Sequence, residues 1–350
     1  MSQLIAPQDN RIDIKSLTLA ELIADMTAAG EPAFRAKQVF RWLHQKNAAS
    51  FAEMSDLSLP MREKYNQKYY IASINVQKRL VSALDGTVKY LYGLSDGNTV
   101  EAVLMQYHHG TSLCISTQVG CRMGCTFCAS TIGGLVRNLT AAEMLEEVYA
   151  ARRDSGHAIN SLVLMGIGEP LDNYDNVLRF LRLLSAPEGL NLSLRHVSLS
   201  TCGLVEQIDR LAEEKLGLTL SVSLHAPNDA LRSQTMPVNR RYPIDTLLVA
   251  CRRYFARTGR RISFEYALID GVNDSDDCAR ELGKKLKGMG CHVNLIPVND
   301  VEGKSYRAAK AARVERFTAI LTEAGLTATV RRKLGADINA ACGQLRRSTG

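Results

Sequence analysis

The run Gly120-Cys-Arg-Met-Gly-Cys-Thr-Phe-Cys128 holds three cysteines, separated by three and then by two residues. It directly follows a β-rich run, Ser112–Thr117, so the three thiols share one short loop at the end of a strand. A cubane iron–sulfur cluster has four irons, and three cysteine ligands leave one iron open to bind another molecule. The spacing therefore predicts that Cys121, Cys125 and Cys128 hold a [4Fe-4S] cluster.

A structural zinc site is the alternative to a cluster. Three cysteines and a histidine, such as His108 or His109, could close a tetrahedral zinc site. Zinc loops more often use paired C-x-x-C units, which this spacing does not provide. The aromatic residue before the last cysteine and the βα pattern around the loop favour the cluster.

Short β-rich runs alternate with amphipathic helical segments from residue 112 onward. Six such units predict a parallel sheet, because parallel strands need crossover connections of this length. An open or partial six-stranded barrel of (βα)6 type fits the count better than a closed eight-stranded one. The expected strands are Ser112–Thr117, Ser161–Met165, Arg195–Ser200, Leu218–Leu224, Ile262–Leu268 and His292–Ile296, and the expected helices include Ala141–Arg152, Tyr174–Leu184, Ile244–Ala256, Asp277–Lys287 and Ala309–Glu323.

The first 75 residues predict a small helical domain. Thr18 to Glu21 reads as a capping box that opens a helix, and Gly30 stands where that helix should stop. A second helix follows, with apolar residues at helical spacing. Basic residues lie on and after it, which makes residues 1–75 a candidate RNA-binding accessory domain: Arg35, Lys37, Arg41, Lys46, Arg62, Lys64 and Lys68.

Residues 76–111 change to a period of two. Apolar residues alternate before and after an Asp96-Gly97 turn, which predicts a β-hairpin. The hairpin is expected to connect the helical domain to a barrel domain of residues 112–350.

The composition limits the class of protein. A chain of 350 residues with 46% apolar content buries a large core, and its longest apolar runs are far shorter than a membrane helix needs. The first residues show no export signal, and nine cysteines is an odd number that favours reduced thiols. We expect a cytoplasmic monomer without membrane contact. Its formal charge of +7 permits an acidic polymer as partner.

A second motif, Met165-Gly-Ile-Gly-Glu-Pro170, ends the second expected strand. It resembles the Gly-Gly-Glu segment with which radical S-adenosylmethionine (SAM) proteins contact the amino group of SAM. A dinucleotide-binding loop is the alternative, but the motif lacks a third glycine and Glu-Pro follows it instead of a helix start.

Further segments resemble one family over nearly the whole chain, the RlmN/Cfr family of radical SAM rRNA adenine methyltransferases, and RlmN more than Cfr. The matching pieces, in chain order, are Phe34-Arg-Ala-Lys-Gln, Thr99-Val-Glu-Ala-Val-Leu-Met105, Leu113-Cys-Ile-Ser-Thr-Gln-Val-Gly-Cys121, Leu199-Ser-Thr201, Ser223-Leu-His-Ala-Pro-Asn228, Leu295-Ile-Pro-Val-Asn299 and Ala341-Cys-Gly-Gln-Leu345.

The resemblance implies a role for each catalytic residue. Cys342 accepts a methyl group from a first SAM, and a second SAM, cleaved at the cluster, supplies the radical that takes hydrogen from that methyl group. The resulting methylene adds to an adenine carbon and joins protein and RNA. Glu101 is the implied general base, and Cys114 is the resolving cysteine that attacks the sulfur of Cys342.

The resemblance also implies a set of SAM contacts: Gly168, Glu169, Ser200, Ser223, Leu224, His225 and Asn299. Without the family, Cys114 and Cys342 would be expected to be small buried apolar residues, and Glu101 a solvated one. The remaining cysteines keep that interpretation. Cys202 stands where serine is expected in the family, beside the SAM site.

The expected activity is methylation of an adenine carbon, with C2 favoured, in 23S rRNA at the peptidyl transferase centre and in tRNA. Methylation at C8, as in Cfr, uses the same cysteines and is the first alternative. A radical SAM enzyme with a non-RNA substrate and a non-catalytic zinc-containing RNA-binding protein are the others. The radical chemistry requires an external electron donor such as flavodoxin or ferredoxin.

Overall fold

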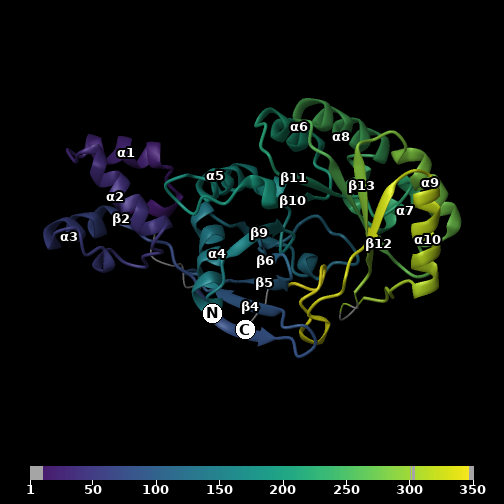
Figure 1. Cartoon of the computed structure of the whole chain (residues 1–350), viewed down its shortest axis with the longest axis horizontal. Coiled ribbons are helices and arrows are strands. Elements are labelled where there is room, and N and C mark those ends of the chain that lie inside the picture. Colours follow the sequence, from purple (N-terminus) through teal and green to yellow (C-terminus); the bar gives the residue numbers. More distant parts are fainter. Residues whose placement is uncertain (1–10, 300, 302–303, 347–350) are drawn as a thin grey trace.

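The computed structural model describes residues 11–299, 301 and 304–346, and its centre is a ten-stranded sheet (Figure 1). Seven consecutive strands of this sheet run parallel to one another. They are β6 (Gly110–Cys114), β9 (Ile159–Leu164), β10 (Val197–Thr201), β11 (Thr219–Ser223), β12 (Ile262–Leu268), β13 (Cys291–Pro297) and β14 (Thr327–Val330). The predicted partial barrel is confirmed, and each of the six expected strands is present. The short outer strand β14 was not predicted.

Helices cover the outer side of the curved sheet (Figure 1). The five expected helices are present as α4 (Ala141–Ser155), α5 (Tyr174–Leu184), α8 (Ile244–Thr258), α9 (Asp276–Leu286) and α10 (Ala311–Glu323). Two further helices, α6 (Val205–Glu213) and the short α7 (Asp229–Thr235), were not among those expected by name. The apolar spacing of Val205, Ile208 and Leu211, which are buried, was the signal available for α6.

Strand alternation sorts the side chains of the parallel strands into two groups. In β10, Val197 and Leu199 are buried against the helices, whereas Ser198 and Ser200 are partly exposed on the other face. Small polar side chains therefore point to the inside of the barrel, where they leave room for a ligand.

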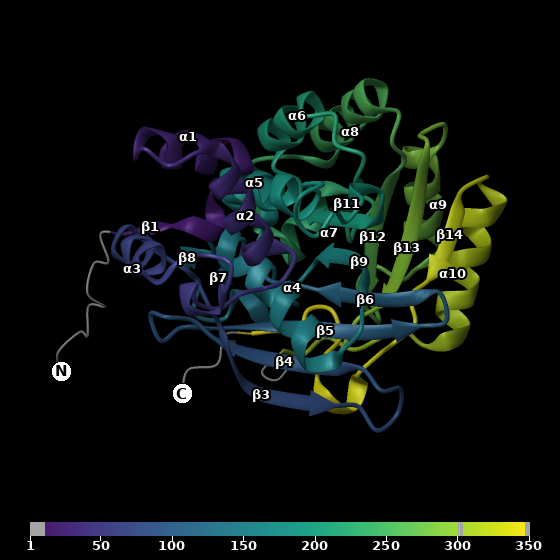
Figure 2. The ribbon, with the colours of Figure 1, turned by 60° about the vertical axis from the view of Figure 1, so that its left-hand side comes forward.

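The predicted hairpin is formed by β4 (Val88–Gly93) and β5 (Thr99–Tyr107), which pair in antiparallel fashion. A further antiparallel strand, β3 (Asn75–Val81), precedes it. The hairpin also pairs with β6, with Val103 opposite Cys114, so these strands continue the barrel sheet. Figure 2 shows β3, β4, β5 and β6 side by side. A residue on β5 therefore lies next to the strand that bears Cys114.

The N-terminal helices form a small module beside α4 and α5 (Figures 1 and 2). It contains β1 (Ile12–Asp13), α1 (Leu19–Ala28), α2 (Ala33–His44), α3 (Leu59–Lys68) and β2 (Tyr69–Tyr70), with the predicted capping box at Thr18. A buried ion pair of 2.5 Å between the Nζ of Lys15 and Glu146 fastens the module to α4. Phe34, although in register with the apolar face of α2, is 58% exposed.

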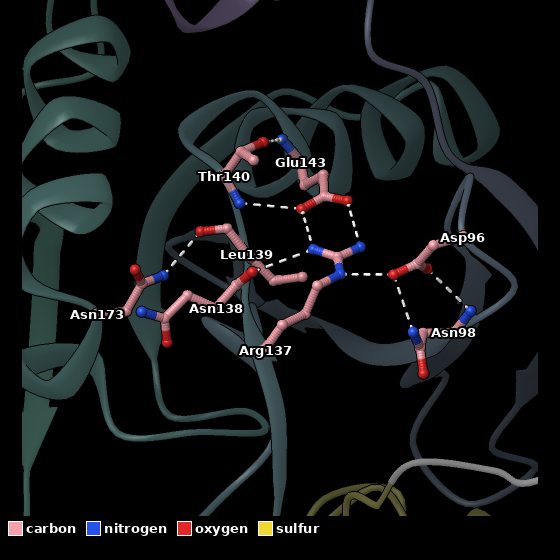
Figure 3. Close-up of polar contacts among 8 residues, drawn as sticks. All are labelled: Asp96, Asn98, Arg137, Asn138, Leu139, Thr140, Glu143 and Asn173. Atoms are coloured by element: carbon pink, nitrogen blue, oxygen red, sulfur yellow. Dashed lines mark hydrogen bonds and ion pairs between the residues drawn. The ribbon is translucent and has the colours of Figure 1, made fainter. Parts of the chain in front are cut away.

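Arg137 ties the region around the cysteine loop together (Figure 3). It lies on β8 (Leu135–Asn138), which pairs with β7 (Gln118–Gly120), and these two strands flank the loop. Its guanidinium donates to both carboxylate oxygens of Glu143, at 2.8 Å each, and to Asp96 at 2.6 Å. Burial alone would raise the pKa of Asp96, but the hydrogen bonds from Arg137 and Asn98 lower it to about 2. One side chain thus joins β8 to the β4–β5 turn and to the start of α4.

No helix among the described residues is long and apolar enough to cross a membrane. The N-terminal stretch in which the sequence shows no export signal lies largely in residues 1–10, outside the described part of the chain.

Candidate active site

The cysteine loop leaves β7 through a position that only glycine can occupy. Gly120 has a φ of +78°, and a Cβ atom there would lie 1.9 Å from the carbonyl oxygen of Gly134. The amide of Cys121 donates to that same oxygen at 3.2 Å. The close approach of the two strands fixes the point at which the loop begins.

The rest of the loop is held by Thr131 and by the C-terminal segment. The hydroxyl of Thr131 donates to the carbonyl oxygens of Cys125 and Cys128, at 3.2 and 2.9 Å. The amide of Ala129 donates to the carbonyl oxygen of Gly343 at 2.8 Å. These hydrogen bonds involve the main chain of the loop and not its thiols.

The three thiols line one cavity of about 970 Å³ that opens to solvent. Cys121 and Cys125 are buried, and burial raises the pKa of Cys121 to about 12 and that of Cys125 further. Thiols in this setting ionise when a metal centre supplies the positive charge. This donor set fits a cluster.

A single zinc ion bound by these three cysteines would need a fourth ligand. Its ligands must converge on one ion, with Zn–S bonds of about 2.3 Å. Among the described residues, no three His, Cys, Asp or Glu side chains are arranged in that way. His108 and His109 stand on the β5–β6 turn, and neither lines the cavity of the cysteines. A cubane allows wider spacing, because each cysteine binds a different iron.

Most of the expected SAM contacts line the cavity of the cysteines. Six of the seven do so, and they come from the ends of β9, β10, β11 and β13: Gly168, Glu169, Ser200, Ser223, His225 and Asn299. Leu224 is the exception. Strand alternation turns its side chain into the core, its amide donates to Glu265, and its carbonyl accepts from Arg232.

The Gly-Ile-Gly-Glu motif is pressed against β7 and the end of β6. A Cβ atom on Gly166 would lie 2.6 Å from the carbonyl oxygen of Ile115, and one on Gly168 would lie 2.7 Å from Gln118. The amide of Glu169 donates to the side-chain oxygen of Gln118 at 2.9 Å. The carboxylate of Glu169 accepts from the amide of Cys202 at 2.8 Å, and burial raises its pKa. The motif and the cysteine loop are thus joined through Gln118.

His225 presents a neutral ring to the cavity. Its Nδ1 accepts a hydrogen bond of 2.9 Å from the amide of Ala267, which places the proton of the neutral ring on Nε2. Burial, and next the charge of Arg232, lower its pKa to about 3. Phe127 of the cysteine loop packs edge-on against it, with ring centroids 5.0 Å apart.

A second cavity, of about 560 Å³, brings Cys114 and Cys342 together. Cys342 also lines the larger cavity, next to the cysteine loop. The side chain of Asn299 donates to the carbonyl oxygen of Cys342 at 3.1 Å. Burial, and then the nearby Cys342, raise the pKa of Cys114 to about 12. Cys342 therefore stands between the cavity of the cluster cysteines and Cys114.

Glu101 lies outside the cavity of the two cysteines. It lines a third cavity, of about 860 Å³, together with residues of the C-terminal segment. Its carboxylate pairs with Lys89 at 2.9 Å and accepts from the amide of Arg346 at 2.9 Å. The structure thus does not bring this expected base to Cys342.

Two arginines of the site were not found from the sequence. Arg331 lines both the cluster cavity and the cavity of Cys114, and Arg232 is fully buried next to the cluster cavity. The basic run Arg331-Arg332-Lys333 was a visible signal for the first. Arg232 belongs to no motif, and its burial is decided by tertiary packing.

Comparison with known proteins agrees with this geometry. Residues 115–282 match the model of the Radical SAM superfamily, and residues 12–71 match that of the ribosomal RNA large subunit methyltransferase N-terminal domain. A probable dual-specificity RNA methyltransferase RlmN of Lachnoclostridium phytofermentans is 53% identical over 338 residues, which cover 97% of this chain and 95% of the relative. The chain belongs to the RlmN family.

Other RlmN relatives and a solved structure extend the match. The probable RlmN of Alkaliphilus oremlandii is 54% identical over 96% of this chain and 98% of its own length. A crystal structure of a radical SAM methyltransferase from Sphaerobacter thermophilus has a TM-score of 0.92 and 46% identity, and covers 95% of this chain and 99% of the other. As a radical SAM protein, this RlmN family member uses a [4Fe-4S] cluster and SAM, and a zinc protein without catalysis is excluded.

Replacement of Cys121, Cys125 or Cys128 by alanine, one at a time, is expected to abolish cluster assembly, because each thiol is predicted to bind a separate iron. Iron analysis after anaerobic reconstitution should give about four irons per wild-type chain and a large loss in each variant. Cys251→Ala removes a fully buried thiol on α8, outside the cavity, and should keep the iron. If one of the three alanine variants kept the full iron content, the thiol replaced in it would not be a ligand.

Proposed function

We propose that this chain methylates C2 of an adenine in RNA through a methyl group carried on Cys342. The observation that carries the proposal is the position of Cys342, which lines the cavity of the cluster cysteines on one side and that of Cys114 on the other. A sulfur atom in this place can receive a methyl group from SAM and later be reached by a second thiol.

The residues of the chain divide the reaction between them. The Cys342 thiolate attacks the methyl carbon of SAM, so that an S–C bond forms while the sulfonium C–S bond breaks. The cluster and a second SAM, when bound, supply the one-electron chemistry that removes hydrogen from this methyl group. Asn299 holds the main chain of Cys342 toward the cavity.

Cys114 is proposed to release the product. Its thiolate attacks the sulfur of Cys342, the S–S bond forms, and the electron pair of the broken S–C bond goes to the carbon attached to the base, which takes up a proton. Glu101 is the proposed base for the ring proton. It can reach the adenine only after its carboxylate leaves Lys89 and the amide of Arg346, so a movement of the C-terminal segment is part of this proposal.

The substrate is proposed from the names of the relatives. They are described as dual-specificity RNA methyltransferases, and the N-terminal match is to a domain of ribosomal RNA methyltransferases. We therefore propose 23S rRNA at the peptidyl transferase centre, and tRNA, as the substrates. We also propose that the enzyme is a cytoplasmic monomer. Flavodoxin or ferredoxin is the proposed electron donor.

The N-terminal module, residues 1–75, is proposed to contact the RNA. Residues 76–111 are the proposed connecting segment, and residues 112–350 the proposed barrel domain. Two of the basic side chains of the N-terminal module already have acidic partners, since Lys64 forms an ion pair with Glu31 and Lys68 with Asp25. Lys37 and Arg41 on α2 are exposed, and these two side chains are the best candidates for phosphate contacts.

The residues around the mouth of the Cys114 cavity are suited to bind a nucleotide. Arg332 and Lys333 are exposed there, and none of the described residues that line this cavity is Asp or Glu. Tyr107 lines the same cavity and stacks on His109, with centroids 5.1 Å apart and planes at 16°. Aromatic faces next to cations bind unstacked bases and their phosphates.

The wild-type enzyme, supplied with SAM, a low-potential reductant and a fragment of the peptidyl transferase centre, is expected to form 2-methyladenosine. Mass spectrometry of the digested nucleosides checks this expectation. Detection of 8-methyladenosine would support the Cfr-like alternative, and the absence of any methylated adenosine from an enzyme with a complete cluster would contradict the proposed function.

Replacement of Cys342 and replacement of Cys114 are expected to stop the reaction at different stages. Cys342→Ala should prevent labelling of the protein by methyl-labelled SAM, because the acceptor sulfur is lost. Cys114→Ala should accumulate a covalent protein–RNA adduct, visible as a shifted band on a denaturing gel. Cys291→Ala, a buried thiol of β13 outside both cavities, is the matched control. Labelled Cys342→Ala protein, or free product at normal yield from Cys114→Ala, would refute the assignment.

Double replacement of Arg332 and Lys333 by alanine is expected to weaken RNA binding while leaving cluster content unchanged. If each side chain contacts one phosphate, the slope of log Kd against log salt concentration should fall by about 1.4. Binding measured at several salt concentrations tests this. Arg252→Ala with Arg253→Ala removes two exposed charges from α8 and should leave the slope unchanged. Equal slopes in both double variants would contradict a phosphate contact at the mouth.

A further inference from the structure

Arg232 of α7 is completely buried, and it is among the largest side chains in that state within the described part of the chain. Its guanidinium donates to the carbonyl oxygens of Cys202 at 2.6 Å, Leu224 at 3.1 Å and Ser223 at 3.2 Å. It also donates to the side-chain oxygen of Asn239 at 2.9 Å and to the carbonyl oxygen of Tyr242 at 3.3 Å. Within the part of the chain that the structure describes, its hydrogen-bond partners are thus all neutral oxygens.

These contacts join the ends of two neighbouring strands that build the SAM cavity. Cys202 follows β10 and Ser223 ends β11, and both residues line the cavity. The amide of Cys202 in turn donates to the carboxylate of Glu169, at the end of the Gly-Ile-Gly-Glu motif. A shift of Arg232 would therefore move three segments that carry expected SAM contacts.

Among the described residues Arg232 forms no ion pair, and the carboxylate that acts on it electrostatically is that of Asp229, on its own helix. A guanidinium stays protonated in proteins, and a buried charge without a counter-charge is costly. The carbonyl oxygen of Cys202 accepts from the guanidinium at 2.6 Å, and Cys202 shares one small buried apolar cluster with Cys125 of the cysteine loop. Of these, Cys125 belongs to the three thiols that become anionic when they bind the cluster. An assembled cluster with its three thiolates would supply a counter-charge at this place.

We propose that Arg232 is a positioning residue for SAM and the fixed counter-charge of the cluster, and that it makes reduction of the cluster easier. Reduction adds one negative charge, which a nearby cation stabilises strongly in a medium of low dielectric constant. Five hydrogen bonds prevent the guanidinium from turning away, so the stabilisation needs no rearrangement. The proposal rests on the cluster and is independent of the RNA substrate.

Redox titration of the reconstituted holoenzyme, followed by the electron paramagnetic resonance signal of the reduced cluster, tests the charge. In Arg232→Met, the ratio of reduced to oxidised cluster at a fixed solution potential should fall about tenfold, which equals a midpoint about 59 mV more negative. Arg253→Met removes an exposed arginine of α8 and should keep the wild-type midpoint, although it changes the net charge equally.

A second variant covers the case in which Arg232→Met does not fold. Asn239→Asp keeps an oxygen acceptor for the guanidinium and adds a negative charge next to it, so its midpoint should also become more negative. If the midpoints of the Asn239→Asp variant and of any folded Arg232→Met protein equal that of Arg253→Met, the counter-charge is refuted.

Arg232→Lys separates the two parts of the proposal. It keeps the charge but cannot make the forked contacts to three carbonyl oxygens. We expect a midpoint near that of the wild type together with weaker SAM binding, measured by the change that SAM causes in the cluster spectrum. SAM binding equal to that of the wild type would refute the positioning role.

Discussion

The site depends on one constraint, the placement of three thiols on one short loop, where burial raises the pKa of each. Gly120 allows the loop to leave its hairpin, and Thr131 shapes the main chain between the cysteines. Burial raises the pKa of Cys121 to about 12, so the site is complete only with a positive metal centre. The proposed role of Arg232 fits the same picture, because a cluster core with three thiolates carries a net negative charge beside it.

The barrel supplies the rest of the site by bringing together strand ends that are far apart in the sequence. Small polar side chains face inward at the ends of β10 and β11, and they leave a cavity next to the cluster loop. The C-terminal segment then packs Ala340 and Leu345 against Val103 and Cys114. This packing places Cys342 between the two cavities, and the proposed chemistry follows from that position.

The position of Glu101 suggests a second role for the C-terminal segment, because this segment helps to hold the Glu101 carboxylate. The carboxylate is held by Lys89 and by the amide of Arg346, away from the cavity of the two cysteines. Residues 338–346 contribute to the cavities on both sides, so a movement of this segment would change access to Cys342 and to Glu101 together. Entry of RNA at the mouth formed by Tyr107, Arg332 and Lys333 would act on the same segment.

The sequence by itself determined the features that depend on local pattern. The spacing of Cys121, Cys125 and Cys128, the alternation of strands and helices, and the capping box at Thr18 were all readable, because cluster ligation and secondary structure use short, regular spacings. Six of the seven expected SAM contacts also line the cavity, since parallel strands end at one edge of the barrel. Leu224 does not, because alternation turns it into the core.

Only the tertiary structure decided which distant groups meet. The family resemblance implied that Cys114 and Cys342 meet, but no pattern in the chain indicates that Glu101 is paired with Lys89 or that Arg232 is buried without an ion pair. Each of these facts depends on side chains brought together from segments that are remote in the sequence or hidden by packing. Their burial and electrostatic environment exist only after the sheet has curved and the C-terminal segment has docked.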